Sequence, residues 1–203
     1  MGLKHCRLSD KRQRKLLEYF VLEVTARAVS DLMEIQANTA VLFYFKVRMI
    51  IAEKLETEVS EFAGEIELDE SYFGVVRKGK RGRGAAGKVP VFGILKRGGK
   101  VYTQIIDNTK TDTLMPIISQ KVKPDSVVYT DSFLSYNALD VSEFKHYRIN
   151  LSEIIADKKN HINGIKNFWN QVKRLLRKYN RISVKHFYLF LKECEFRFYY
   201  GSH

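Results

Sequence analysis

Two aspartates occupy positions where a strand can present a catalytic carboxylate. Asp69 lies in GEIELDESYFG, residues 64–74, where apolar residues alternate with acids. Asp131 directly follows the apolar run in SVVYTDSF, residues 126–133. Burying an ionised carboxylate near a core costs free energy unless a partner compensates it, so Asp69 within a strand suggests a function. Asp131 suggests one because the C-terminal end of a buried strand is a common place for an active-site residue. The alternatives are an edge strand with one wet face for Asp69 and a turn-forming or helix-capping role for Asp131.

The alternation in the first strand predicts the face of each side chain. Ile66 and Leu68 should point one way, and Glu67 and Asp69 the other. If the strands of Asp69 and Asp131 lie side by side, the two acids suggest a divalent-metal site, because Mg²⁺ prefers carboxylate oxygens. Two such ions can activate a water or a 3′-hydroxyl and stabilise the leaving oxygen of a phosphodiester. We expect the two carboxyl groups within roughly 4–6 Å of each other.

The charge balance supplies a reason for a phosphodiester substrate. The 203 residues include 35 Lys and Arg against 23 Asp and Glu, a net charge of +12. Such a surplus favours a polyanion partner, nucleic acid before an anionic membrane surface. The 45% hydrophobic content excludes wholesale disorder, and two cysteines exclude a disulfide framework or structural zinc site. The sequence has no apparent signal peptide or membrane-spanning run, so we expect a cytoplasmic protein.

Two basic segments are candidates for contact with DNA phosphates. Residues 77–100 hold nine Lys or Arg and no acid, in a Gly-rich stretch expected to be a flexible loop that clamps the DNA backbone. Residues 158–185 hold nine more and no acid, mostly on a helix with one apolar and one polar side. A solvated hairpin tip and a solvated helix face are the alternatives. The predicted DNA-binding residues are Arg77, Lys78, Lys80, Arg81, Arg83, Lys88, Lys166, Lys173, Arg174 and Arg177.

The order of predicted elements indicates an α/β protein with an RNase H-like mixed sheet and flanking helices, after an all-helical start. Helical patterns cover residues 8–56, with a short helix from Thr25 to Met33 that suits a helix-turn-helix module. Strand-like runs follow at 65–73, 89–95, 101–106, 126–130 and 144–149, and further helices at 111–122, 161–179 and 184–198. We expect a helix-turn-helix-like DNA-binding region at residues 1–58 and a catalytic domain at 59–203.

Five strings in this order resemble the transposases of small bacterial insertion sequences, in the ISXO-like group of the DDE superfamily. They are TARAVSDLMEIQANTA, DESYFG, RKGKRGRGAAGK, VYTDSFLSYNAL and NHINGIKNFWNQVKRLLRKYN. The resemblance implies an RNase H-like core and cleavage and strand transfer at terminal inverted repeats, with two Mg²⁺ or Mn²⁺ ions. It implies double-stranded DNA, both repeats and target, as partner, a homodimer or higher oligomer on DNA, and a bacterial, nucleoid-associated location. Asp69 and Asp131 match the first two catalytic and metal-binding carboxylates.

The third catalytic position departs from the family pattern. The family string usually reads Asn-Gly-Ile-Glu, and Lys166 occupies the glutamate position here, with 34 residues between it and Asp131. A charged lysine cannot ligate a metal. Asn163 lies one turn earlier on the same helix face, and some relatives use Asn in place of Glu. Either Asn163 is the third catalytic residue, or this copy is impaired.

Glu34 is a second departure. The family usually has Gly at the turn of the helix-turn-helix, where the backbone is left-handed, and this costs a non-Gly residue about 1 kcal/mol. An acid beside a recognition helix also repels phosphate. Both departures favour a decayed copy. The alternatives to an active transposase are therefore a catalytically inactive DNA-binding relative and an RNase H-like nuclease without strand transfer. A basic RNA-binding protein explains the charge but not the strand carboxylates.

Overall fold

The structure is a computed structural model that describes residues 6, 8–58, 61–74, 88–149, 162–179 and 182–201. It divides into two compact units. One comprises residues 1–57 and 172–194, and the other residues 58–171 and 195–203. Two helices, α5 (Asn163–Leu176) and α6 (Val184–Tyr200), contribute to both units. The predicted division of function between residues 1–58 and 59–203 stays a prediction.

Three helices begin the first unit. They are α1 (Asp10–Val21), α2 (Ala26–Leu32) and α3 (Ala37–Glu58). Thr25 caps α2 as its sequence suggests, because its hydroxyl accepts a hydrogen bond from the Ala28 amide at 3.3 Å. Within this unit, the Arg48 guanidinium donates to Glu193 at 2.6 Å in a buried ion pair and lies 3.9 Å from the Phe190 ring centroid. This pair ties α3 to the part of α6 that belongs to the same unit.

The turn between α2 and α3 has a left-handed residue at the position where the resemblance implies one. Glu34 has φ 51°. The Ile35 amide donates to the Ser30 carbonyl at 3.0 Å, and the Glu34 amide to the Asp31 carbonyl at 3.4 Å. This is the Schellman pattern of a helix C-terminus, in which the left-handed position is usually glycine. The acid therefore stands in a conformation that its own Cβ disfavours.

Glu34→Gly is expected to raise the free energy of unfolding by about 0.5–1 kcal/mol, because glycine removes the left-handed penalty but loses more chain entropy on folding. Urea denaturation at constant ionic strength measures the change. Glu34→Ala is the matched control, since it removes the same charge and keeps the Cβ. An alanine variant as stable as the glycine variant would assign the gain to charge rather than to backbone strain.

The second unit contains a five-stranded mixed sheet with the order β3-β2-β1-β4-β5. Its strands are β1 (Glu65–Phe73), β2 (Val89–Lys96), β3 (Val101–Ile105), β4 (Val127–Asp131) and β5 (Lys145–Ile149). The pairs β1–β2 and β2–β3 are antiparallel, whereas β1–β4 and β4–β5 are parallel. Three antiparallel strands followed by parallel additions confirm the predicted RNase H-like mixed sheet. Because β1 is paired on both sides, the edge-strand alternative for Asp69 is wrong.

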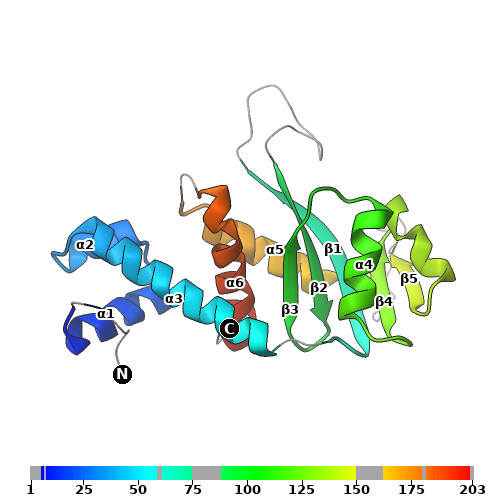
Figure 1. Cartoon of the computed structure of the whole chain (residues 1–203), viewed down its shortest axis with the longest axis horizontal. Coiled ribbons are helices and arrows are strands. Elements are labelled where there is room, and N and C mark those ends of the chain that lie inside the picture. Colours follow the sequence, from blue (N-terminus) through cyan, green and yellow to red (C-terminus); the bar gives the residue numbers. More distant parts are fainter. Residues whose placement is uncertain are drawn as a thin grey trace. The chain divides into compact units, whose positions relative to one another are not determined.

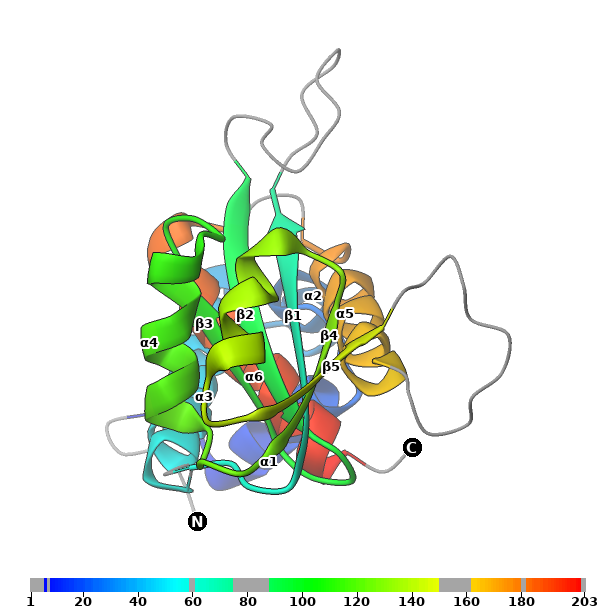
Figure 2. The ribbon, with the colours of Figure 1, turned by 90° about the vertical axis from the view of Figure 1, so that its right-hand side faces the viewer.

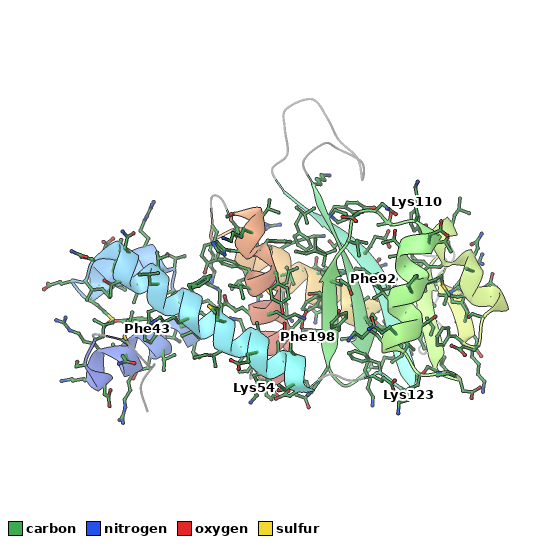
Figure 3. The ribbon with its side chains drawn as sticks, viewed as in Figure 1. Phe43, Lys54, Phe92, Lys110, Lys123 and Phe198 are labelled. Atoms are coloured by element: carbon green, nitrogen blue, oxygen red, sulfur yellow. The ribbon has the colours of Figure 1, made fainter. Side chains whose placement is uncertain are left out.

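Helices cover both faces of this sheet (Figure 1). One face packs against α4 (Thr111–Lys121) and the 3₁₀ helix η1 (Leu134–Val141), which lie in front of the strands in Figure 2. Phe92 is buried in this layer, while Lys110 and Lys123 project outward near the two ends of α4 (Figure 3). The core of this layer includes Ile66, Leu68, Phe92, Ile94, Leu114, Ile118, Val128, Tyr136 and Leu139.

The other face packs against the first part of α5. Trp169 of α5 lies over Gly93 of β2 so closely that a Cβ on the glycine would come within 2.6 Å of the indole ring. Ile165, Phe168 and Trp169 are buried as the apolar stripe of this helix predicts. None of the helices in the described ranges is long and apolar enough to cross a membrane.

Candidate active site

Asp69 and Asp131 are brought to neighbouring positions of adjacent strands. The parallel register of β1 and β4 pairs Glu67 with Tyr129. Two residues further along each strand are Asp69 and Asp131, so both side chains point to the same face of the sheet, the face covered by α5. Parallel strands lie about 4.8 Å apart, which puts the two carboxyl groups within reach of shared cations. The metal-ligand role of the pair stays a prediction.

The electrostatics of Asp69 reflect this crowding. Burial, followed by the neighbouring charges of Glu70 and Asp131, raises the pKa of the Asp69 carboxyl from 3.8 to about 7. The Lys166 charge and a backbone hydrogen bond act in the opposite direction. Asp69 therefore interacts with both Asp131 and Lys166. Ionising a buried carboxylate without a partner costs free energy, and a bound divalent cation would offset that cost.

Glu70 lies next to Asp69 in sequence but on the opposite face of β1. Its carboxylate is buried and accepts a hydrogen bond from the Tyr136 hydroxyl at 3.0 Å. Burial, together with the charge of Glu70, raises the pKa of Tyr136 well above its usual value, so this hydroxyl stays a donor. Glu70 thus acts on the site through its charge and is held within the α4 layer.

The end of β4 holds Asp131 by its side chain and its backbone. One carboxylate oxygen accepts a hydrogen bond from the Phe133 amide at 3.0 Å, which fixes the rotamer in a short turn. The neighbouring Thr130 hydroxyl lies 2.8 Å from the Asp131 carbonyl oxygen and 2.8 Å from Nε2 of His146. Nδ1 of His146 lies 2.7 Å from Asp140. Since the Thr130 side chain is completely buried, these groups support the strand end rather than react.

The first turn of α5 brings the remaining candidates to the same face. Asn163 is exposed at the start of the helix, and Lys166 is partly buried one turn later. Because the Lys166 charge acts on Asp69, Lys166 lies near this aspartate. In the described part of the chain, no group of three or more His, Cys, Asp or Glu is arranged to hold a metal ion. The oxygen donors that the sequence suggests for a hard cation are the carboxylates of Asp69 and Asp131 and the side-chain carbonyl of Asn163, and their role as ligands stays a prediction.

The predicted DNA contacts fall into two sets. Arg77, Lys78, Lys80, Arg81 and Arg83 lie outside the described residues. Lys88, directly before β2, is partly buried, whereas Lys173 and Arg174 of α5 and Arg177, which directly follows this helix, are exposed. The polar side of α5 is thus exposed as the sequence predicts. Binding of DNA by any of these residues stays a prediction.

Sequence reasoning missed two charged residues at this site. Glu67 is buried with 1% of its side chain exposed, and Arg97 donates to it at 3.0 Å. The alternation of β1 predicts that Glu67 shares the face of Asp69. It does not predict that α5 and Arg97 cover that carboxylate, because those contacts join residues 30 and 98 positions apart.

The chain is similar to the Mos1 transposase in a strand transfer complex, with 12% identity and a TM-score of 0.33 over 98% of this chain and 78% of that one. A paired-end complex of the same transposase with the left transposon end gives 12% identity and a TM-score of 0.31 over 98% and 79%.

Sequence relatives are more specific. An uncharacterized transposase-like protein of Haemophilus influenzae is 61% identical over 99 residues, which are 49% of this chain and 80% of the relative. The family model described as ISXO2-like transposase domain matches residues 61–199, which include the whole sheet, both aspartates and α5. With most of its length matched, the chain belongs to the ISXO2-like transposase family.

Proposed function

We propose that this chain is a DDE-type transposase that binds double-stranded DNA at terminal inverted repeats and catalyses metal-dependent cleavage and strand transfer. The observation that carries the proposal is the register of β1 and β4, which directs Asp69 and Asp131 to one face. Their interaction in the pKa of Asp69 supports it. Two divalent ions held by such a pair would stabilise the attacking and leaving oxygens of a phosphodiester.

The residues of the chain take distinct roles in this proposal. Asp69 and Asp131 hold Mg²⁺ or Mn²⁺, and Asn163 offers a neutral amide oxygen from α5. Lys173, Arg174 and Arg177 bind phosphates along the exposed side of that helix. The basic residues 77–88 clamp the DNA backbone. A homodimer or higher oligomer brings two DNA ends together, in the bacterial cytoplasm near the nucleoid.

A second candidate is a DNA-binding relative without cleavage. The observation that favours it is the Lys166 charge acting on Asp69. A cation at this point opposes divalent metal and replaces an acidic ligand of the family with a group that cannot coordinate. The net charge of +12 would still hold the protein on DNA.

A plasmid assay separates the candidates. The substrate is a supercoiled plasmid that carries both ends of the DNA element encoding this chain, incubated with protein and Mg²⁺. Cleavage at the ends that is abolished by Asp69→Asn and by Asp131→Asn, and retained by the exposed control Asp107→Asn, supports the catalytic proposal. Joined products identify a transposase, and nicks without joining identify a nuclease. Retention of the plasmid without nicks by this chain, together with nicks gained by Lys166→Glu, supports the DNA-binding relative. Nicks that survive loss of Asp69, or no nicks in this chain and in Lys166→Glu alike, overturn the catalytic proposal.

DNA affinity is expected to fall steeply with salt, and neutralising the loop should flatten that dependence. Glutamine at Arg77, Lys78, Lys80, Arg81 and Arg83 removes up to five phosphate contacts, each worth roughly 0.9 in the slope of log affinity against log salt. Fluorescence anisotropy with a labelled duplex between 50 and about 200 mM salt measures the slope. A control variant carries glutamine at Lys110, Lys121, Lys123 and Lys145, outside both basic segments, and the slopes are compared per charge removed. An unchanged slope in the loop variant would remove these residues from the interface.

A further inference from the structure

We infer that Glu67 is a positioning residue: its buried carboxylate fixes the first turn of α5 on the sheet and so sets where Asn163 and Lys166 stand relative to Asp69 and Asp131. The inference deepens the proposed function and rests on it. Glu67 lies on the same face of β1 as Asp69, two residues earlier. It touches neither DNA nor metal in this proposal and acts through the helix.

The two carboxylate oxygens of Glu67 have separate partners. One accepts a hydrogen bond from the Ile165 amide at 2.9 Å, and the other from Nε of Arg97 at 3.0 Å. The first amides of a helix have no partner within it, and an N-cap side chain usually accepts from one of them. Here the cap position is Ile162, whose carbonyl accepts the Lys166 amide at 3.3 Å and whose side chain cannot accept a hydrogen bond. The Glu67 carboxylate, from a strand, therefore accepts the hydrogen bond that an N-cap side chain accepts in other helices.

Arg97 is itself held in place, so the carboxylate has a fixed orientation. Its guanidinium carbon lies 3.7 Å from the ring centroid of Tyr129 in β4, and Nη1 lies 3.3 Å from Glu65. The Arg97 amide also donates to the Glu65 carbonyl at 3.0 Å. Glu67 therefore links β1, the β2–β3 turn, β4 and α5. The same strands carry Asp69 and Asp131.

Two glycines allow α5 to come this close. A Cβ on Gly164 would lie 2.6 Å from Leu95 and 3.0 Å from the Glu67 oxygen, and a Cβ on Gly93 would lie 2.6 Å from the Trp169 ring. Gly93 is the direct partner of Asp69 in the β1–β2 register. The helix is thus fixed at its start by Glu67 and one turn later beside Asp69. A buried ion pair is rarely needed for stability alone, because well-packed apolar groups serve as well.

The consequence concerns the third donor. Asn163, Ile165 and Lys166 share the turn whose amide Glu67 holds. A shift of that turn moves the Asn163 amide and the Lys166 ammonium relative to the aspartate pair. Positions within about half an ångström matter for such a site. In this inference, Glu67 sets the distance from the Asn163 amide and the Lys166 ammonium to the aspartate pair, without contacting the reacting groups.

Glu67→Gln and Glu65→Gln are a matched pair for the test. Each substitution removes one negative charge from β1 next to Arg97. Only Glu67 also accepts a hydrogen bond from the Ile165 amide. A glutamine at 67 has one acceptor oxygen and cannot satisfy both donors. We expect Glu67→Gln to increase hydrogen exchange of the Ile165 amide at least tenfold, while the amides of β1 and β4 keep wild-type protection. Acrylamide quenching of Trp169, the single tryptophan, should also increase. Glu65→Gln should change neither.

A purely structural role predicts a different result. If Glu67→Gln lowers the urea midpoint but leaves Ile165 exchange and Trp169 quenching in native buffer at wild-type values, the inference is overturned. Should Glu67→Gln fail to fold, Arg97→Gln replaces it, since loss of the orienting guanidinium should raise Ile165 exchange about threefold. Unchanged exchange in that variant also overturns the inference.

A metal arm separates this inference from the proposed function. Mn²⁺ alone, added to isotope-labelled protein, should broaden the amide signals of Asp69, Asp131 and Asn163. In Glu67→Gln the first two should broaden as before and Asn163 less, and equal broadening of all three would contradict the positioning role. If Mn²⁺ broadens none of them in the unaltered chain, the proposed metal site fails, and Ile165 exchange still decides whether Glu67 positions α5.

Discussion

Lys166→Glu is expected to raise the affinity of the chain for Mn²⁺ at least tenfold and to produce or increase Mg²⁺-dependent cleavage of an end-containing plasmid. The structure provides the reason, because the Lys166 charge acts on Asp69 in the absence of any metal. At about 5 Å and an effective dielectric near 20, repulsion between a lysine and one divalent ion is on the order of 6–7 kcal/mol before relaxation. The flexible stem can swing outward and avoid most of that cost.

An outward swing of the lysine does not supply the missing carboxylate ligand. Lys166→Glu both removes a positive charge and adds a carboxylate, and these two effects need separate controls. Lys166→Gln removes the charge without adding a carboxylate and should recover only part of the Mn²⁺ affinity. Lys173→Glu adds a carboxylate at an exposed position two turns further along the helix and should recover none. Isothermal titration with Mn²⁺ compares the three variants. In metal-free buffer, Lys166→Glu should be less stable than the unaltered chain, because it adds a third acid to a site where Asp69 already resists ionisation.

The opposite result would assign the third role to Asn163. Robust cleavage by the chain as it stands, abolished by Asn163→Ala and not improved by Lys166→Glu, would refute the impaired copy. The Asn163 amide would then be the functional third group. Asn163 is exposed at the start of α5.

The strands and the aspartate pair could be predicted from the sequence for a physical reason. Runs of β-branched and aromatic residues define β1 and β4, and parallel pairing of these strands directs aspartates at equivalent positions to one face of the sheet. The left-handed Glu34 was expected for a different reason, because the resembled family usually has glycine at this turn.

Glu67 and the two close-approach glycines could not be predicted, because their roles depend on contacts between distant elements. Local alternation leaves open whether the Glu67 face is wet or covered, and only the packing of α5 settles that it is covered. Gly93 within a strand and Gly164 within a helix are locally unfavourable, and their reason is the short separation between α5 and β2. One signal was present in the sequence: Ile162 stands where a helix normally has a polar cap, which indicates an acceptor from elsewhere.

Asp69→Asn is expected to stabilise the metal-free protein at pH 8 by about 1–3 kcal/mol and to leave its stability nearly unchanged below pH 4. The sign follows from the direction of the pKa change. Burial and the charges of Glu70 and Asp131 raise the folded-state pKa of Asp69 from 3.8 to about 7. Below pH 3.8 both folded and unfolded chains hold the proton, and this group does not discriminate between them. Between the two values the unfolded chain releases the proton first, so stability falls as pH rises, by up to about 1.4 kcal/mol per pH unit.

Local relaxation and water reduce the full difference, which is why the expected gain is smaller than the pKa difference alone gives. Urea denaturation of both proteins from pH 4 to pH 8 in the presence of EDTA measures it, with exposed Asp107→Asn as the control. An equal effect of Asp69→Asn at all pH values, or a loss of stability at pH 8, would show that partners other than a metal hold the ionised carboxylate. The expected result instead identifies Asp69 as a group that destabilises the free fold. A divalent cation should reverse that effect, raising the stability of the unaltered chain at pH 8 but not that of Asp69→Asn, because a bound ion favours the ionised carboxylate that the fold alone disfavours.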